Sequence, residues 1–228
     1  MVERAFDHEN RMLPVKAHKF LDVNKIQLVG GAVCLDFVNT TGARASGQPR
    51  ERLCEYDDVV TWSRRAGIFA SLRKSRHSRA SAPDAAQSQE ALQRVHDVRE
   101  VLYRVFRPVA DKRTPTRKDV RHLDRLSRED RLRRELVIAE HGAELKVSSG
   151  TSELDRLIST VVDSAVTLLR SDRLRRLKRC AECDWLFLDE TKNQSRMWCK
   201  KVCGDRVRAR RHYSARRGAS RVATLRMD

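Results

Sequence analysis

Four of the six cysteines fall into two close pairs in the last quarter of the chain. Two residues separate Cys180 from Cys183, three separate Cys199 from Cys203, and fifteen lie between the pairs. Short gaps of this kind let both sulfurs of a pair reach one ion, and four thiolates in a tetrahedral set are typical ligands of structural zinc. The spacing therefore predicts one bound Zn²⁺ that supports the fold and leaves no open position for an activated water.

Two other interpretations of these cysteines are ordinary thiols and a dithiol redox centre. The second pair at zinc-ribbon distance, and the lack of a βαβ pattern before the first pair, favour zinc over redox chemistry. Cys34 and Cys54 belong to neither pair. No neighbouring histidine marks either one as a nucleophile, so both are predicted to be packed core thiols.

The segment after the fourth cysteine, GDRVRARRHYSARR, is rich in arginine. On a helix, Arg206, Arg210 and Arg217 fall near one face, and Tyr213 lies close to it. Such a face suits a phosphate backbone, although a solvated basic helix without a partner is the alternative. The residues predicted to contact nucleic acid are Arg196, Arg206, Arg208, Arg210, Arg211, Arg216 and Arg217.

Net charge supports a polyanionic partner. The 228 residues carry a formal charge of +17, and residues 171–228 account for +10 of it, with 17 Lys and Arg against 7 Asp and Glu. Arginine favours bidentate contacts with phosphates and base edges over simple solvation. Nucleic acid is therefore the predicted partner, and DNA is favoured over RNA.

The residues before the cysteine pairs predict a mainly helical domain. Helices are expected after the Gly-Gly turn of GGAVCLDFVNT, over Asp57 to Ala66, and from Ala91 to Val109 with a kink at Pro108. The residues between Ser71 and Gln89 are expected to form a long loop. Two further helices are expected to begin at capping residues, Thr116 and Ser152.

The fold class predicted is mainly α, with one antiparallel hairpin around His141-Gly142 and a small treble-cleft-like or ribbon-like zinc finger that ends in a basic helix. The predicted organisation is a flexible leader (1–24), a helical domain (25–170), a basic junction (171–179), the finger (180–217) and a flexible tail (218–228). The helical domain is expected to fold without the finger because its own apolar helix faces supply a core.

Several classes of protein are disfavoured. The first residues, MVERAFDHEN, lack the apolar stretch of a secretory signal, and the longest apolar run, Leu28 to Leu35, is too short to span a membrane. A cytoplasmic location is therefore expected, without a membrane partner. No phosphate loop, nucleophile–base pair, carboxylate dyad or HExxH-type cluster is present at a motif spacing, so the protein is not expected to be an enzyme.

The text CAECDWLFLDETKNQSRMWCKKVCGDRVRARRHYSARR resembles the CGNR zinc finger over about residues 178 to 217. The resemblance implies that the four paired cysteines are the ligands. It also carries over further fixed positions of the motif, at Asp189, Asn193, Arg196, Trp198, Gly204 and Arg206. Asp205 replaces the family's Asn, and the second cysteine pair encloses three residues where four are usual.

The upstream stretches GGAVCLDFVNT and ERLCEYDDVVTWSRRAGIF resemble the ABATE domain, the usual partner of this finger. Together the two resemblances cover nearly everything after residue 25. They imply a stress-induced bacterial transcription regulator whose finger binds DNA. Asp36, Asn39 and Arg44 are the polar residues near the first motif, and they either form a pocket for a small-molecule effector or cap and pair internally.

The function expected from the sequence is therefore zinc-dependent DNA binding in a bacterial transcription regulator. Its N-terminal domain is expected to sense a ligand or to form a homodimer. The alternative is an RNA-binding or ribosome-associated zinc ribbon protein, because a basic zinc ribbon suits folded RNA equally well.

Overall fold

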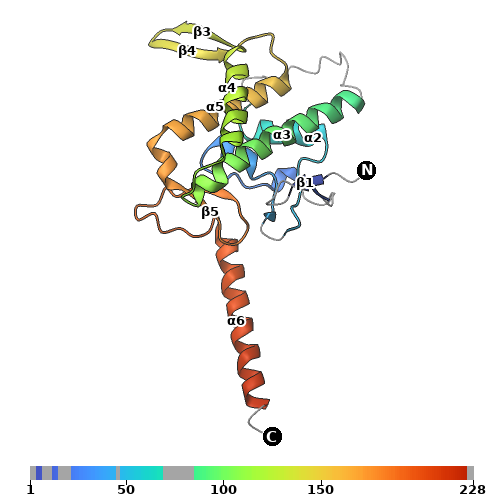
Figure 1. The fold of residues 1–228 in the computed structure, drawn as a ribbon, viewed down its shortest axis with the longest axis vertical. Coiled ribbons are helices and arrows are strands. Elements are labelled where there is room, and N and C mark those ends of the chain that lie inside the picture. Colours follow the sequence, from blue (N-terminus) through green and yellow to red (C-terminus); the bar gives the residue numbers. More distant parts are fainter. Residues whose placement is uncertain (1–3, 7–11, 15–21, 45–46, 69–84, 225–228) are drawn as a thin grey trace.

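The computed structural model describes residues 4–6, 12–14, 22–44, 47–68 and 85–224. These residues form six α-helices and three two-stranded antiparallel sheets. Figure 1 shows a helical body with one hairpin (β3–β4) projecting at one end and a long helix (α6) projecting at the other. The mainly helical fold predicted from the sequence is confirmed.

Five helices build the body: α1 (Val33–Val38), α2 (Tyr56–Arg65), α3 (Ala85–Ala110), α4 (Arg117–Arg131) and α5 (Glu153–Arg170). Both predicted capping residues begin their helices. The Thr116 hydroxyl accepts a 3.1 Å bond from the Asp119 backbone N–H, and the Ser152 hydroxyl accepts one of 3.1 Å from Asp155. Each bond satisfies one of the N–H groups that the first helical turn leaves without a partner. A short 3₁₀ turn, η1 (Val23–Lys25), precedes α1.

α3 is longer than predicted at both ends. It begins at Ala85, so residues 85–89 are helical although a loop was expected there, and Pro108 lies inside the helix, which continues to Ala110. Ala, Gln and Glu dominate the first turns, and these residues lose little side-chain freedom in a helix. The remainder of the expected loop lies outside the described residues.

The core lies where α1 packs between α3 and α5. α5 contributes a broad apolar face that includes Leu157, Val161 and Leu168, all buried, and this face packs against both α1 and α4. Phe37 of α1 meets Trp62 of α2 with ring centroids 5.4 Å apart, and both are fully buried. Burying an α1 of only six residues on several sides fixes the orientation of its polar side chains.

The three sheets are all small. β3 (Arg134–Ala139) pairs with β4 (Gly142–Val147) around the predicted His141-Gly142 turn. β1 (Arg4–Phe6) pairs with β2 (Met12–Pro14), and β5 (Leu177–Arg179) pairs with β6 (Leu186–Leu188). The sequence predicted only the first of these pairs, because three-residue strands are too short to show a period of two.

Candidate metal centre and nucleic-acid interface

The sulfurs of Cys180, Cys183, Cys199 and Cys203 all lie within 4.8 Å of one another. Measured separations are 3.5 Å from Cys183 to Cys199, 3.8 Å from Cys199 to Cys203, and 3.8 Å from Cys203 to Cys183. A tetrahedron with Zn–S bonds of about 2.3 Å has edges of about 3.8 Å. The four cysteines thus form a site for one structural zinc ion, as predicted.

Two local structures present these sulfurs. Cys180 follows β5, and its carbonyl accepts a 3.1 Å bond from the Asp184 N–H, while its N–H donates to the Trp185 carbonyl at 2.8 Å. Asp184 adopts a positive φ of 62°, which closes the turn around Cys183. Cys203 lies in the first turn of α6 (Lys201–Thr224), which brings it back to Cys199. The three-residue spacing of the second pair is therefore compatible with chelation.

Asp189 holds the loop between the cysteine pairs. Its fully buried carboxylate accepts bonds from the Lys178 ammonium at 2.8 Å, the Arg196 N–H at 2.8 Å, and both the N–H and the hydroxyl of Thr191. Burial opposes ionisation, but the bonds from Lys178 and Thr191 outweigh it and hold the pKa of Asp189 below its usual value. The loop is thus tied to β5 by a charged centre.

Two further motif positions support the ligands. Arg196 donates to the Cys199 carbonyl at 2.5 Å, and its guanidinium lies 4.7 Å from the centre of the Phe187 ring. Gly204 lets the Trp198 ring lie against the start of α6, since a Cβ there would stand 3.0 Å from that ring. The described contacts of Arg196 thus stabilise the finger, and its predicted contact with nucleic acid stays a prediction.

Zinc with four thiolates carries a net charge of −2, and two cations lie against the ring of Trp185, two residues after Cys183. Lys200 lies 4.5 Å and Arg52 lies 5.2 Å from the centre of this ring. Burial lowers the pKa of Arg52, while Glu51 and, after it, Cys183 favour its charged form. Arg52 comes from outside the finger, and no spacing in the sequence connected it with the metal.

The thiols differ in how readily they lose their protons. Hydrogen bonds from Cys183 and Cys199 hold the pKa of Cys180 below its usual value. Hydrogen bonding with Cys180 and Cys183 raises the pKa of Cys199, and burial raises that of Cys203. Their protons therefore leave most readily in exchange for a metal ion, which stabilises the thiolates directly.

α6 presents the predicted basic surface. Its 24 residues span about 36 Å, and the helix leaves the body beyond its first turns (Figure 1). Arg210 makes a bidentate pair with Glu182 in the turn between the first two cysteines, and Arg208 pairs with Asp205. Among the described residues, neither Arg206 nor Arg211 has an ion-pair partner.

Two of the arginines predicted to contact nucleic acid lie further along the helix. Arg216 and Arg217 belong to α6, but their side chains lie outside the described part of the structure. Asn193, another position of the finger motif, is exposed at the end of the loop that Asp189 holds.

The finger is docked on α1 through strand β6. Asn39, at the end of α1, donates to the Leu186 carbonyl at 2.8 Å and accepts from its N–H at 2.9 Å. The Leu188 N–H donates to the Gly30 carbonyl at 2.9 Å, and the Trp185 indole donates to the Thr41 carbonyl at 3.2 Å. Leu186 and Leu188 are buried in the same core as the helices. Among the described residues, the GGAVCLDFVNT motif, residues 30–40, thus hydrogen-bonds to the backbone of β6 along its open side, as a neighbouring strand would.

The profile described as ABATE, "putative stress-induced transcription regulator", matches residues 31–172, which is more than half of the chain. The chain belongs to the ABATE family. A second profile, the CGNR zinc finger, matches residues 176–217 and includes all four ligands. No curated protein matches the chain.

The polar candidates of the ABATE domain are all engaged internally. Asp36 accepts a 2.8 Å bond from the Gly30 N–H, and burial raises its pKa to about 6. Arg44 makes a bidentate pair with Glu100 at 2.8 and 2.6 Å and stacks 4.0 Å from the centre of the Tyr103 ring. These contacts agree with internal capping and pairing. An effector pocket formed by Asp36, Asn39 and Arg44 stays a prediction.

We expect purified protein to contain one zinc per chain, and Cys180→Ser or Cys203→Ser to lose it. Because β6 belongs to the shared core, loss of the metal should also lower the thermal midpoint of the ABATE domain, by about 10 °C. Metal analysis and thermal unfolding measure both effects. Cys54→Ser, which removes a non-ligand thiol, is the control and should keep its zinc. A zinc-free variant with the wild-type midpoint would refute the structural role.

Asn39→Ala should loosen the finger without releasing zinc. The substitution leaves a buried N–H and C=O of Leu186 without partners, which costs about 2 to 4 kcal/mol. Hydrogen exchange at residues 186–188 should become faster, and urea unfolding should show the loss. Asn193→Ala, at an exposed position, is the control. Unchanged exchange at residues 186–188 would mean that Asn39 does not hold the finger.

Proposed function

We propose that this ABATE protein is a transcription regulator that binds duplex DNA through α6. The matching family profiles support a zinc-binding regulatory protein, and the step from there to DNA rests on α6. This helix leaves the body as a free basic rod, with Lys201, four arginines and one carboxylate among the side chains described from Lys201 to Ser214. The major groove of B-DNA, about 12 Å wide, admits one α-helix of this kind.

In this proposal, the zinc site fixes the direction in which α6 leaves the finger. Cys203 and Gly204 anchor the first turn, and the Glu182–Arg210 pair holds the third turn against the metal-binding loop. A rigid start leaves fewer orientations to be lost on binding, so less of the contact energy is spent on ordering.

Geometry divides the arginines between two roles. Arg206 and Arg211 lie about 140° apart around the helix axis, at 3.6 residues per turn, so both cannot face the floor of the groove. We propose that Arg211 faces the groove, and that Arg206, which lies on the Arg210 side of the helix and near the Glu182 carboxylate, meets a phosphate. Phosphate contacts supply most of the affinity and base contacts supply the sequence preference.

We also propose that the protein acts in the cytoplasm. It is proposed not to be an enzyme, because four thiolates close the zinc site against a catalytic water. No described helix is long and apolar enough to cross a membrane. Control by a small-molecule effector remains part of the proposal, with the contact of Asn39 and β6 as the route from the ABATE domain to the finger.

The salt dependence of DNA affinity tests the role of α6. If four to six arginines displace counterions, log affinity should fall against log salt with a slope of about −4 to −5. Arg206→Ala/Arg211→Ala should make the slope shallower by about 1 to 2 and weaken binding at least tenfold. The control is Lys118→Ala/Arg125→Ala, which removes the same charge from exposed positions on α4.

The Asp205→Asn variant should bind duplex DNA more tightly than wild type and retain its zinc, because the substitution releases Lys201 and Arg208 from their ion pairs with Asp205.

Identical slopes and affinities in wild type and in the α6 variants would remove the support for α6 as the binding surface. Competition by structured RNA separates the two nucleic acids. If folded RNA displaces duplex DNA at a much lower concentration than unlabelled DNA does, the RNA-binding alternative replaces the proposal.

A further inference from the structure

The β3–β4 hairpin carries an apolar face that the rest of the described structure leaves open. Leu136 pairs directly with Leu145, and Ile138 pairs with Ala143. Because paired residues and residues two apart point to the same side of a sheet, these four share one face. Leu136, Ile138 and Leu145 are 65%, 77% and 59% exposed, and the hairpin stands clear of the helical body (Figure 1).

Exposure on this scale is unfavourable in an isolated chain. An exposed Leu or Ile forgoes the free energy that burial of its side chain would release, and a two-stranded hairpin is barely stable by itself. Both strands also keep one open edge. Leu132, which directly follows α4, is also 88% exposed. Contiguous apolar surface of this kind marks an interaction site.

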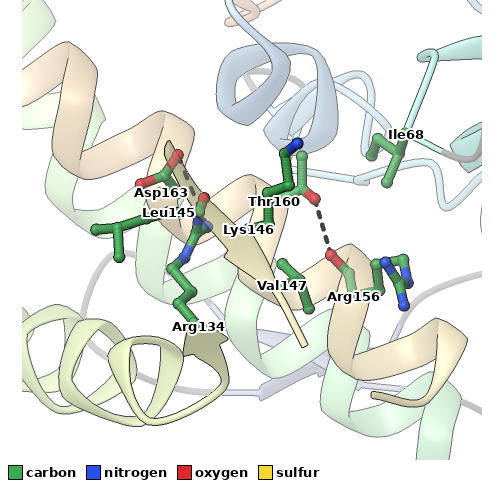
Figure 2. Close-up of a pocket in the computed structure, with 8 residues that line it drawn as sticks. All are labelled: Ile68, Arg134, Leu145, Lys146, Val147, Arg156, Thr160 and Asp163. Atoms are coloured by element: carbon green, nitrogen blue, oxygen red, sulfur yellow. Dashed lines mark hydrogen bonds and ion pairs between the residues drawn. The ribbon is translucent and has the colours of Figure 1, made fainter. Parts of the chain in front are cut away.

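A basic cavity lies at the base of the same hairpin. It has a volume of about 360 Å³ and lies between the hairpin, α5 and Ile68. Its lining holds three basic side chains, Arg134, Lys146 and Arg156, and one carboxylate, that of Asp163 (Figure 2). Arg134 already interacts with Asp130 and Asp163. Among the described residues, the Arg156 guanidinium has no acidic partner. Leu145 and Val147 continue the apolar face into the cavity.

The tip of the hairpin has the opposite charge. Glu140 lies in the turn, and Glu144 lies in β4, where it pairs with Lys146. Glu140 is exposed and unpaired among the described residues. Leu145, the cavity residue nearest the turn, is three residues beyond Gly142 and Val147 is five, so about 10 to 17 Å of strand separates the turn from these lining residues. Arg156 lies on α5 at the base of the hairpin, and among the described residues it forms no ion pair with Glu140 of its own chain. The hairpin therefore carries an acidic tip and an apolar face, and its base forms one wall of the basic cavity.

We infer that two copies of the chain form a two-fold dimer in which the apolar faces of the hairpins pack antiparallel and each acidic tip enters the partner copy's cavity. A two-fold interface brings the same patch from both copies together, so one end of the patch must complement the other. Glu140 would face Arg156 of the second copy, and Leu136, Ile138 and Leu145 would be removed from water. The area is modest, so the dimer is expected to dissociate at low protein concentration.

The arrangement leaves the DNA-binding end free. The hairpin and α6 project from opposite ends of the body (Figure 1), so pairing of the hairpins does not cover α6. The dimer thus presents two basic helices related by a two-fold axis, a symmetry that suits paired half-sites. The inference itself does not rest on DNA binding and is tested without nucleic acid.

Sedimentation equilibrium of the zinc-loaded full chain, over a range of concentrations, tests the dimer. Wild type should dimerise, and Leu136→Ser/Ile138→Ser should be at least tenfold weaker. Leu28→Ser/Val120→Ser, which removes two exposed apolar side chains elsewhere, should match wild type. A monomeric wild type, or equal association in all three proteins, would overturn the inference.

A charge exchange tests the pairing of tip and cavity. Glu140→Arg alone and Arg156→Glu alone should each dimerise at least tenfold more weakly than wild type. In a dimer of either variant, residues of like charge would face each other at both tip–cavity contacts. An equimolar mixture of the two variants should form heterodimers close to wild-type strength, because both contacts are then complementary. Circular dichroism confirms that each variant is folded. If the mixture associates no better than either variant alone, the tip does not meet the cavity.

Discussion

Four thiolates on one zinc ion are the constraint on which the C-terminal part of this protein depends. The metal joins three pieces of the chain: the turn after β5, Cys199 ahead of α6, and the first turn of α6 itself. Buried thiols with raised pKa values resist losing their protons, and the cation supplies the compensation. Because Cys203 lies in the first turn of α6, binding of the metal also fixes the direction of this helix.

The charges around the zinc show how the finger and the ABATE domain share one structure. A zinc ion with four thiolates is a dianion, and one of its nearby cations, Arg52, comes from the ABATE domain. Strand β6 belongs to the finger by sequence, yet its Leu186 and Leu188 lie in the core of the helical domain. Asn39 satisfies both backbone groups of Leu186, as a neighbouring strand would. A change in the position of α1 would therefore act directly on β6.

Opposite ends of the molecule carry different kinds of surface. α6 is basic and has few apolar side chains, which suits a polyanion. The β3–β4 hairpin is apolar along one face and changes sign from tip to base, which suits a copy of itself. The body separates the two surfaces (Figure 1), so occupation of one leaves the other accessible.

The sequence by itself determined what depends on local spacing. Cysteine pairs with two and three intervening residues identified the zinc ligands, side-chain caps at Thr116 and Ser152 marked helix starts, and the arginine run after Cys203 indicated the basic helix. Tertiary structure decided what depends on residues far apart in the chain. Asn39 meets Leu186 across 147 positions, and Arg210 meets Glu182 across 28. No spacing rule connects such pairs, because packing of the whole core brings them together.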